Sequence, residues 1–115
     1  MAKLVLRAAG KVVALDETEI LWLEASHNYV VFHTNGSSYL VRGTLENFIT
    51  GLDPRRFLRI HRSTVVNLAR VGRVEHHSGS RVTLLLTNGE RLPVSRSRAR
   101  MVLQALAPGG TAVAS

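Results

Sequence analysis

Two groups of residues have the types that catalysis or metal binding requires. Asp53, His61 and Ser63 offer the acid, base and nucleophile of a hydrolytic triad, but a triad depends on geometry, and no G-x-S-x-G turn is present to expose the serine. His76 and His77 are adjacent, and adjacent strand residues point to opposite faces, so one metal ion cannot bind both from a regular strand. The chain has no cysteine, which excludes thiolate ligands and disulfides. We therefore predict no enzyme, no metal and no cofactor.

The second half of the chain concentrates arginine, whose planar guanidinium pairs with phosphate groups and with the edge of guanine. Lys and Arg number 15 against 8 Asp and Glu, which gives a formal net charge of +7. Residues 1–52 hold 4 cations and 5 anions, whereas residues 53–115 hold 11 cations and 3 anions. Solubilising surfaces usually mix both signs, but residues 91–100 contain four Arg and no acid. This pattern favours a nucleic-acid-binding surface.

Length and composition indicate one ordinary globular domain. The chain has 115 residues, of which 45% are hydrophobic and 20% are charged, and these values argue against disorder and fibrous repeats. No uninterrupted apolar run exceeds four residues, far below the ~18 residues that a membrane-spanning helix needs. The N-terminus also lacks the apolar core of a signal peptide. We therefore expect a cytoplasmic protein with no membrane segment.

Alternating and β-branched runs predict that most of the chain forms short strands. His27-Asn28 is expected to form a tight polar loop between two strands, and residues 61–64 an exposed bend before a buried segment at 65–68. Asn35-Gly36 is typical of a two-residue hairpin turn. The predicted strands are residues 3–7, 11–15, 20–26, 29–34, 37–41, 57–60, 71–75, 81–86 and 91–94.

Two helices are predicted from apolar residues at i, i+3, i+4 and i+7. The first covers residues 45–52 with Thr44 as its N-cap. The second is a terminal helix with Ser95 as its N-cap, whose apolar residues stand at 99, 102, 103 and 106. The expected fold is mainly β, with stacked small antiparallel sheets and two short helices. Residues 1–107 are expected to form the domain and residues 108–115 a flexible tail. A helix-turn-helix is excluded because strands separate the two helices.

Residues 57–68 read FLRIHRSTVVNL, which closely resembles the F-x-R-I-H-R-S-x-x-V-N signature of the LytTR DNA-binding domain family. The segment ILWLEA at 20–25 and the segment LPVSR at 92–96 stand in that family's order and spacing. The resemblance covers residues 12–106. It implies a bacterial transcription regulator that binds paired direct repeats in promoters.

The resemblance also implies that loops, and no recognition helix, enter successive major grooves of DNA. It places base contacts at His27, Asn28, Arg62 and Arg96. The chemistry agrees, because Arg pairs with guanine O6 and N7 and Asn pairs with adenine N6 and N7. The residues suited to phosphate contact are Arg59, His61, Ser63, Ser95, Arg98 and Arg100. Asn67 is interpreted as a framework residue, and for His61 a framework role stays open beside phosphate contact.

Domains of this family usually follow a receiver or a membrane sensor, and only about a dozen residues precede the resemblance here. The input signal is therefore expected on another chain, with a sensor or receiver as partner, or to be absent. A stand-alone regulator and the detached output domain of a larger one both remain open. Two alternatives from other classes are a protein-interaction or antagonist module with a basic face, and a non-specific nucleic-acid binder.

Overall fold

The computed structural model describes residues 3–107, which form ten strands, two α-helices and four short 3-10 turns. The strands are β1 (Lys3–Ala8), β2 (Lys11–Asp16), β3 (Ile20–Ser26), β4 (Tyr29–Thr34), β5 (Ser37–Arg42), β6 (Phe57–His61), β7 (Thr64–Asn67), β8 (Val71–His77), β9 (Arg81–Leu86) and β10 (Arg91–Val94). The helical elements are η1 (Glu17–Glu19), α1 (Leu45–Ile49), η2 (Leu68–Arg70), η3 (Ser78–Ser80), η4 (Arg96–Arg98) and α2 (Ala99–Leu106).

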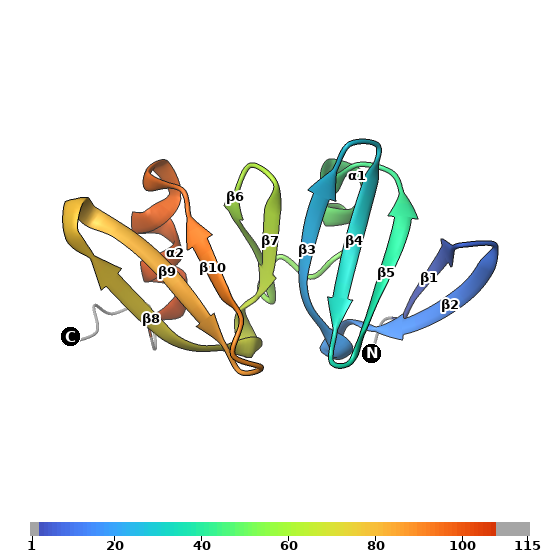
Figure 1. Ribbon diagram of the computed structural model, residues 1–115, viewed down its shortest axis with the longest axis horizontal. Helices are drawn as coiled ribbons and strands as arrows, with labels where there is room; N and C mark the ends of the chain where they lie inside the picture. Colours follow the sequence, from blue (N-terminus) through green and yellow to red (C-terminus); the bar gives the residue numbers. More distant parts are fainter. Residues whose placement is uncertain (1–2, 108–115) are drawn as a thin grey trace.

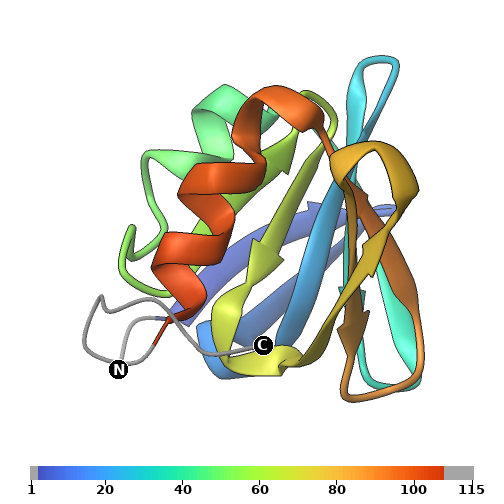
Figure 2. The ribbon, with the colours of Figure 1, turned by 90° about the vertical axis from the view of Figure 1, so that its left-hand side faces the viewer.

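The strands form two antiparallel sheets, drawn side by side in Figure 1. One sheet has seven strands in the order β2-β1-β5-β4-β3-β7-β6, and the other has three in the order β10-β9-β8. The β1–β2 hairpin joins the larger sheet through a single residue pair, Ala8 with Val41. Helices α1 and α2 lie on the same flank of the strands (Figure 2). The predicted mainly β, antiparallel fold with two short helices is confirmed, although one sheet is larger than expected.

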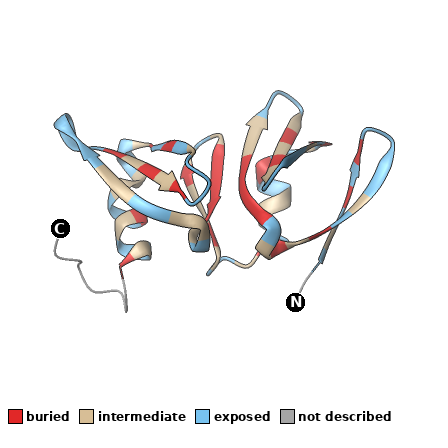
Figure 3. Cartoon of the chain, turned by 60° about the horizontal axis from the view of Figure 1, so that its bottom comes forward, coloured by how far each residue is buried: buried red, intermediate tan, exposed pale blue. Residues whose placement is uncertain are grey.

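Two hydrophobic cores meet at β3 and β7, whose buried positions are visible at the centre of Figure 3. On β3, Ile20 and Leu23 pack in the first core, and Leu21 and Trp22 in the second. A register shift between Ile20 and Trp22 breaks the regular alternation. A strand that is covered on both faces reads as a continuous apolar run, which explains the sequence ILWL.

The two helices start or end differently from the prediction. Helix α1 ends at Ile49 because the Gly51 N–H donates to Phe48 O at 3.1 Å, so the chain tightens into a turn that still buries Leu52. The Thr44 hydroxyl accepts from Asn47 N–H at 3.3 Å, which confirms that N-cap. Ser95 is the N-cap of the terminal helical segment, as predicted, but its side chain makes no capping hydrogen bond.

At Ser95 the helical segment opens with the 3-10 turn η4. Arg98 N–H donates to the Ser95 carbonyl at 3.0 Å, so the backbone oxygen makes the bond expected of the hydroxyl. The hydroxyl instead accepts from Arg98 Nη1 at 3.4 Å.

No helix within residues 3–107 is long and apolar enough to cross a membrane. The predicted tail, residues 108–115, lies outside the described residues.

Candidate nucleic-acid interface

Four connections lie along one long edge of the molecule, uppermost in Figure 1. They are the β3–β4 turn, the β6–β7 turn, the β8–β9 turn and the junction between β10 and α2, and together we call them the loop edge. The molecule measures 46 × 29 × 25 Å, and this edge follows its longest dimension. All four residues predicted for base contact, His27, Asn28, Arg62 and Arg96, lie on the loop edge.

The β3–β4 turn holds His27 and Asn28, which are both exposed. Ser26 pairs with Tyr29, so these two residues alone make the turn. His27 has φ 54, a left-handed conformation that costs a non-glycine residue roughly 1 to 2 kcal/mol. Asn28 O accepts from Gly43 N–H at 2.9 Å, which ties the turn to the end of β5. The backbone is therefore held while both side chains face solvent.

The β6–β7 turn presents Arg62 at its tip. His61 pairs with Thr64, which leaves Arg62 and Ser63 as a two-residue loop. Arg62 is exposed, and Ser63 O accepts from Ala25 N–H on β3 at 2.8 Å. The turn is therefore anchored to the same strand that leads into His27 and Asn28.

His61 and Ser63 bond to each other inside this turn. Ser63 N–H donates to His61 Nδ1 at 3.2 Å, and the Ser63 hydroxyl lies 3.0 Å from the same nitrogen. A backbone N–H can only donate, so Nδ1 accepts and the ring proton of the neutral imidazole is on Nε2. His61 thus has a framework role through Nδ1 and keeps an Nε2 donor for an outside acceptor.

The β10–α2 junction presents Arg96 and is joined to β6. Ser95 N–H donates to Ile60 O at 2.8 Å, a bond that connects the two sheets. Because Ile60 precedes Arg62 by two residues and Ser95 directly precedes Arg96, this bond fixes the two arginine-bearing loops relative to each other. Arg96 and Arg100 are exposed, and Arg98 is half-buried.

The arginines divide into those that pair with acids and those that do not. Ion pairs join Arg59 to Glu46, Arg55 to Asp53, Arg56 to Glu17, and both Arg73 and Arg91 to Glu75. Within residues 3–107, Arg62, Arg96, Arg98 and Arg100 have no carboxylate within 4.0 Å. Of the arginines predicted to contact DNA, these four are therefore the ones whose charge is not compensated by an acid, and only Arg59 is paired.

The acids that face arginine stay ionised to low pH. Hydrogen bonding by Arg59 lowers the pKa of Glu46, and hydrogen bonding by Arg91 lowers the pKa of Glu75. Both carboxylates are therefore negative at neutral pH and neutralise their own partners. The charge presented by the loop edge comes from the arginines that have no such partner.

Sequence reasoning missed two exposed arginines beside these loops. Arg42 pairs with Tyr29, immediately after Asn28, and its guanidinium lies 5.4 Å from the centre of the Tyr29 ring. Arg81 follows the β8–β9 turn, where Gly79 lies beside the Arg96 guanidinium. Arg42 was missed because it lies in the first half of the chain, which has a net negative charge. Its position next to the loop edge follows only from the register between β4 and β5. Gly79 is close to Arg96 only in the folded chain.

The alternative chemistries find no support in the arrangement of side chains. His61 bonds to Ser63, but the Asp53 carboxylate bonds to Arg55 and not to His61, so the three residues do not form a triad. Within residues 3–107, no three His, Cys, Asp or Glu side chains form a metal-binding group.

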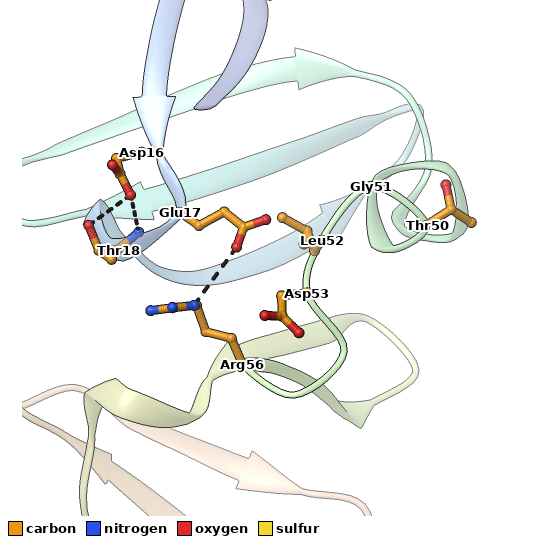
Figure 4. A pocket seen from close by; sticks show the side chains of 8 residues that line it. All are labelled: Asp16, Glu17, Thr18, Thr50, Gly51, Leu52, Asp53 and Arg56. Carbon is orange, nitrogen blue, oxygen red and sulfur yellow. Dashed lines mark hydrogen bonds and ion pairs between the residues drawn. The ribbon is translucent and has the colours of Figure 1, made fainter. Parts of the chain in front are cut away.

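A pocket of about 370 Å³ lies beside η1 (Figure 4). Glu17 and Arg56 face each other in it at 3.8 Å. Because η1 precedes β3 and the His27 turn follows it, this pocket lies at the opposite end of that strand from the loop edge. It is therefore separate from the candidate interface.

A β fold that places polar, arginine-bearing turns along one edge is suited to contact nucleic acid through loops. The chain belongs to the LytTr DNA-binding domain family, whose model matches residues 10–107. The resemblance of the 57–68 motif to this family is thereby confirmed. Strand β1 lies outside the matched residues.

Two relatives are longer proteins. The sensory transduction protein LytR of Streptococcus mutans is 32% identical over 97 residues, which are 84% of this chain and 40% of that protein. The sensory transduction protein LytT of Bacillus subtilis is 31% identical over 98 residues, which are 85% of this chain and 41% of that protein. The chain thus spans 40 to 41% of the length of these relatives.

One solved structure shares the fold. It is the LytTr DNA-binding domain of a Bacillus cereus protein described as a methyl-accepting/DNA response regulator. It matches with a TM-score of 0.82 at 24% identity, over 92% of this chain and 97% of that one. This likeness confirms the fold that the sequence predicted.

Proposed function

We propose that this domain reads promoter DNA sequence-specifically and serves as the DNA-binding part of a transcription regulator. The observation that carries the proposal is a pair of exposed arginines, Arg62 and Arg96. Neither has an acidic partner among residues 3–107. Their loops are joined by the hydrogen bond from Ser95 N–H to Ile60 O. A fixed separation between two arginine-bearing loops suits the reading of bases at a fixed spacing. The names of the relatives, sensory transduction proteins, agree with a role in regulation.

The contacts divide between base edges and phosphates. Arg62 and Arg96 take guanine O6 and N7, while His27 and Asn28 read a neighbouring site through the β3–β4 turn. Ser63, Ser95, Arg98, Arg100 and the Nε2 of His61 contact phosphate and set the register on the duplex. Two copies bind a direct repeat, each with its loops in successive major grooves, and a sensor or receiver in the cytoplasm supplies the signal.

Selection from a random-sequence duplex pool at ~0.15 M salt tests this proposal, because this ionic strength screens much of the non-specific attraction. We expect enrichment of a short element that occurs twice in the same orientation. An unenriched pool that binds only at low salt contradicts sequence-specific reading and favours a non-specific binder.

A protein-interaction module requires an apolar docking patch near the basic loops. The exposed large hydrophobic residues among residues 3–107 are Val5, Val12, Leu40 and Met101. Three lie on β1, β2 and β5 and the fourth on α2, so none is on a turn of the loop edge. This distribution favours DNA over a protein partner for that edge.

A further inference from the structure

The guanidinium of Arg59 is engaged inside the protein, although the resemblance places Arg59 among the phosphate contacts. Its Nη1 donates to Glu46 Oε2 at 2.9 Å, its Nε donates to His61 O at 3.3 Å, and its Nη2 donates to Arg62 O. The side chain is only 26% exposed. Arg59 therefore connects helix α1, through Glu46, to the backbone of the turn that carries Arg62.

The carbonyls of this turn depend on Arg59. The register between β6 and β7 shifts between Arg59 and His61, so an irregularity in the strand pairing directly precedes the His61–Thr64 pair that closes the turn. His61 O and Arg62 O accept from Arg59, and Ser63 O accepts from Ala25 N–H. One side chain thus donates to two consecutive carbonyls of the turn, at His61 and at Arg62. Only arginine has a planar fork that reaches three acceptors at once.

The charge of Arg59 is compensated where it lies. Glu46 is 68% exposed beside it, so a phosphate that approaches Arg59 also approaches a carboxylate. The pair carries almost no net charge and adds little to the release of counterions from DNA. Arg62, three residues along the chain, is exposed and has no carboxylate within 4.0 Å among residues 3–107.

We propose that Arg59 and Glu46 form a positioning pair that fixes the β6–β7 turn. The pair thereby orients Arg62 toward the DNA base that it reads. Arg59 acts through Arg62 and does not itself contact DNA. This inference rests on the proposed function, because the orientation of Arg62 affects sequence-specific binding only if Arg62 reads a base. It predicts that a substitution in the pair that keeps its charge alters selectivity between sequences and leaves non-specific affinity unchanged.

Arg59→Lys is the informative substitution because it keeps the charge and removes the fork. We expect the ratio of non-specific to specific Kd to fall about tenfold, with the non-specific Kd and the salt slope as in the wild type. Arg55→Lys is the matched control, since Arg55 also bonds to an acid, Asp53, but contacts no carbonyl of the turn. An Arg59→Lys variant with the wild-type ratio overturns the proposal.

Two further variants separate positioning from phosphate contact. If Arg59 touched phosphate, Arg59→Ala would weaken binding to all duplexes alike and lower the salt slope by about one. If Glu46 merely competed with phosphate for Arg59, Glu46→Ala would strengthen binding to all duplexes at an unchanged ratio. The positioning pair instead predicts that Glu46→Ala lowers the ratio, by about threefold.

A measurement without DNA separates this inference from the proposed function. Hydrogen exchange of the Ser63 and Ala25 amides, which bond at the turn, should be faster in Arg59→Lys than in the wild type and unchanged in Arg55→Lys. Unchanged exchange in Arg59→Lys overturns the positioning pair, whatever the DNA results. A wild-type protein without sequence preference contradicts the proposed function, while faster exchange in Arg59→Lys still supports the control of the turn by Arg59.

Discussion

The arginines on and beside the loop edge fall into two groups, those bonded to acceptors within the protein and those without a carboxylate partner. Arg62 and Arg96 are exposed and have no carboxylate nearby in residues 3–107, whereas Arg59, equally prominent in the 57–68 motif, is bound to Glu46 and to two carbonyls. Residue type alone cannot make this distinction, because a guanidinium that braces a backbone and one that reads a base look identical in sequence. The hydrogen-bond and ion-pair partners of each arginine in the folded chain distinguish the two roles.

Replacing either base-reading arginine should reduce specific binding. Arg62→Ala or Arg96→Ala should each cost about 1 to 3 kcal/mol on the selected duplex and relax the preference at one base position. Fluorescence anisotropy titrations on that duplex and on single-base variants measure both effects. Arg55→Ala serves as the control, because Arg55 pairs with Asp53, which lines the pocket at the other end of β3. Wild-type affinity and selectivity in either variant would show that the residue does not read a base.

Phosphate contacts should behave differently from base contacts. Arg98→Ala or Arg100→Ala should weaken binding to all duplexes by a similar factor and reduce the slope of log K against log salt by about one. Titrations at several salt concentrations on specific and scrambled duplexes provide the comparison. A loss confined to the specific duplex would instead assign base reading to that arginine.

At the scale of elements, buried polar bonds hold the strands that present the loops. Asn67 is 1% exposed, its Nδ2 donates to Ile20 O at 2.8 Å, and its Oδ1 accepts from Ala69 N–H at 3.0 Å. It thus fastens the end of β7 to the start of β3, which confirms its interpretation as a framework residue. The two strands that meet there lead to the β6–β7 and β3–β4 turns.

Asn67→Ala should lower the free energy of unfolding by about 2 kcal/mol, because it leaves a carbonyl and an amide at the junction without their partner. Urea denaturation measures this change. The control is Asn35→Ala at an exposed turn, where we expect a change below about 0.5 kcal/mol. A loss at Asn67 no larger than at Asn35 would contradict the framework role.

Most elements could be predicted from the sequence because their signals are local. The strands β3 and β4 and the tight turn at His27-Asn28 follow from β-branched runs and a polar dipeptide. The end of α1 at Ile49 could not be predicted, since the apolar spacing continues to Leu52 while the chain tightens. The Ser95–Ile60 bond also escaped prediction, because it depends on how one sheet lies against the other. The approach of Gly79 to Arg96 depends on the pairing of β8, β9 and β10 within one sheet, which the sequence does not specify.

The motif at 57–68 identified the position of the β6–β7 turn correctly but could not assign roles within it. His61 and Ser63 bond to each other, and Arg59 bonds to the carbonyls on either side. These bonds follow from a two-residue loop that begins at a break in the ladder. A sequence pattern records that the residues occur together without recording which of them face outward.

At the scale of the whole molecule, ion pairs make stability depend on pH. The pKa values of Glu46, Asp53 and Glu75 are lowered, in each case mainly by hydrogen bonds from arginine residues. A carboxyl whose pKa is lower in the folded state contributes stability above its unfolded pKa and loses it as the pH falls through the folded pKa. The loss should begin below about pH 4 to 4.5, where ordinary carboxyls take up protons.

We therefore expect the Tm to be nearly constant from pH 7 to 5 and to fall below about pH 4.5. Thermal melts followed by circular dichroism across this range test the expectation. Glu75→Gln should flatten the fall, because it removes one of the titrating groups. A Tm that does not decrease between about pH 4.5 and pH 3 would contradict this assignment.

At this scale the proposed contact with DNA involves no recognition helix and rests on the loop edge as a whole. Its turns come from both sheets, and the Ser95–Ile60 and Ser63–Ala25 bonds hold three of them in one frame. Side chains on such a frame can reach the floor of the major groove only if the edge faces it. The position of bound guanines is therefore the direct test of this geometry.

Guanine methylation interference on the selected duplex tests the central claim most directly, because a methyl group on N7 blocks contact in the major groove. We predict interference in clusters about 10 to 10.5 base pairs apart, the spacing of successive major grooves. Arg62→Ala should remove one cluster from each copy of the repeat. Binding that tolerates methylation at every guanine of a site that contains guanine would contradict major-groove reading by these loops.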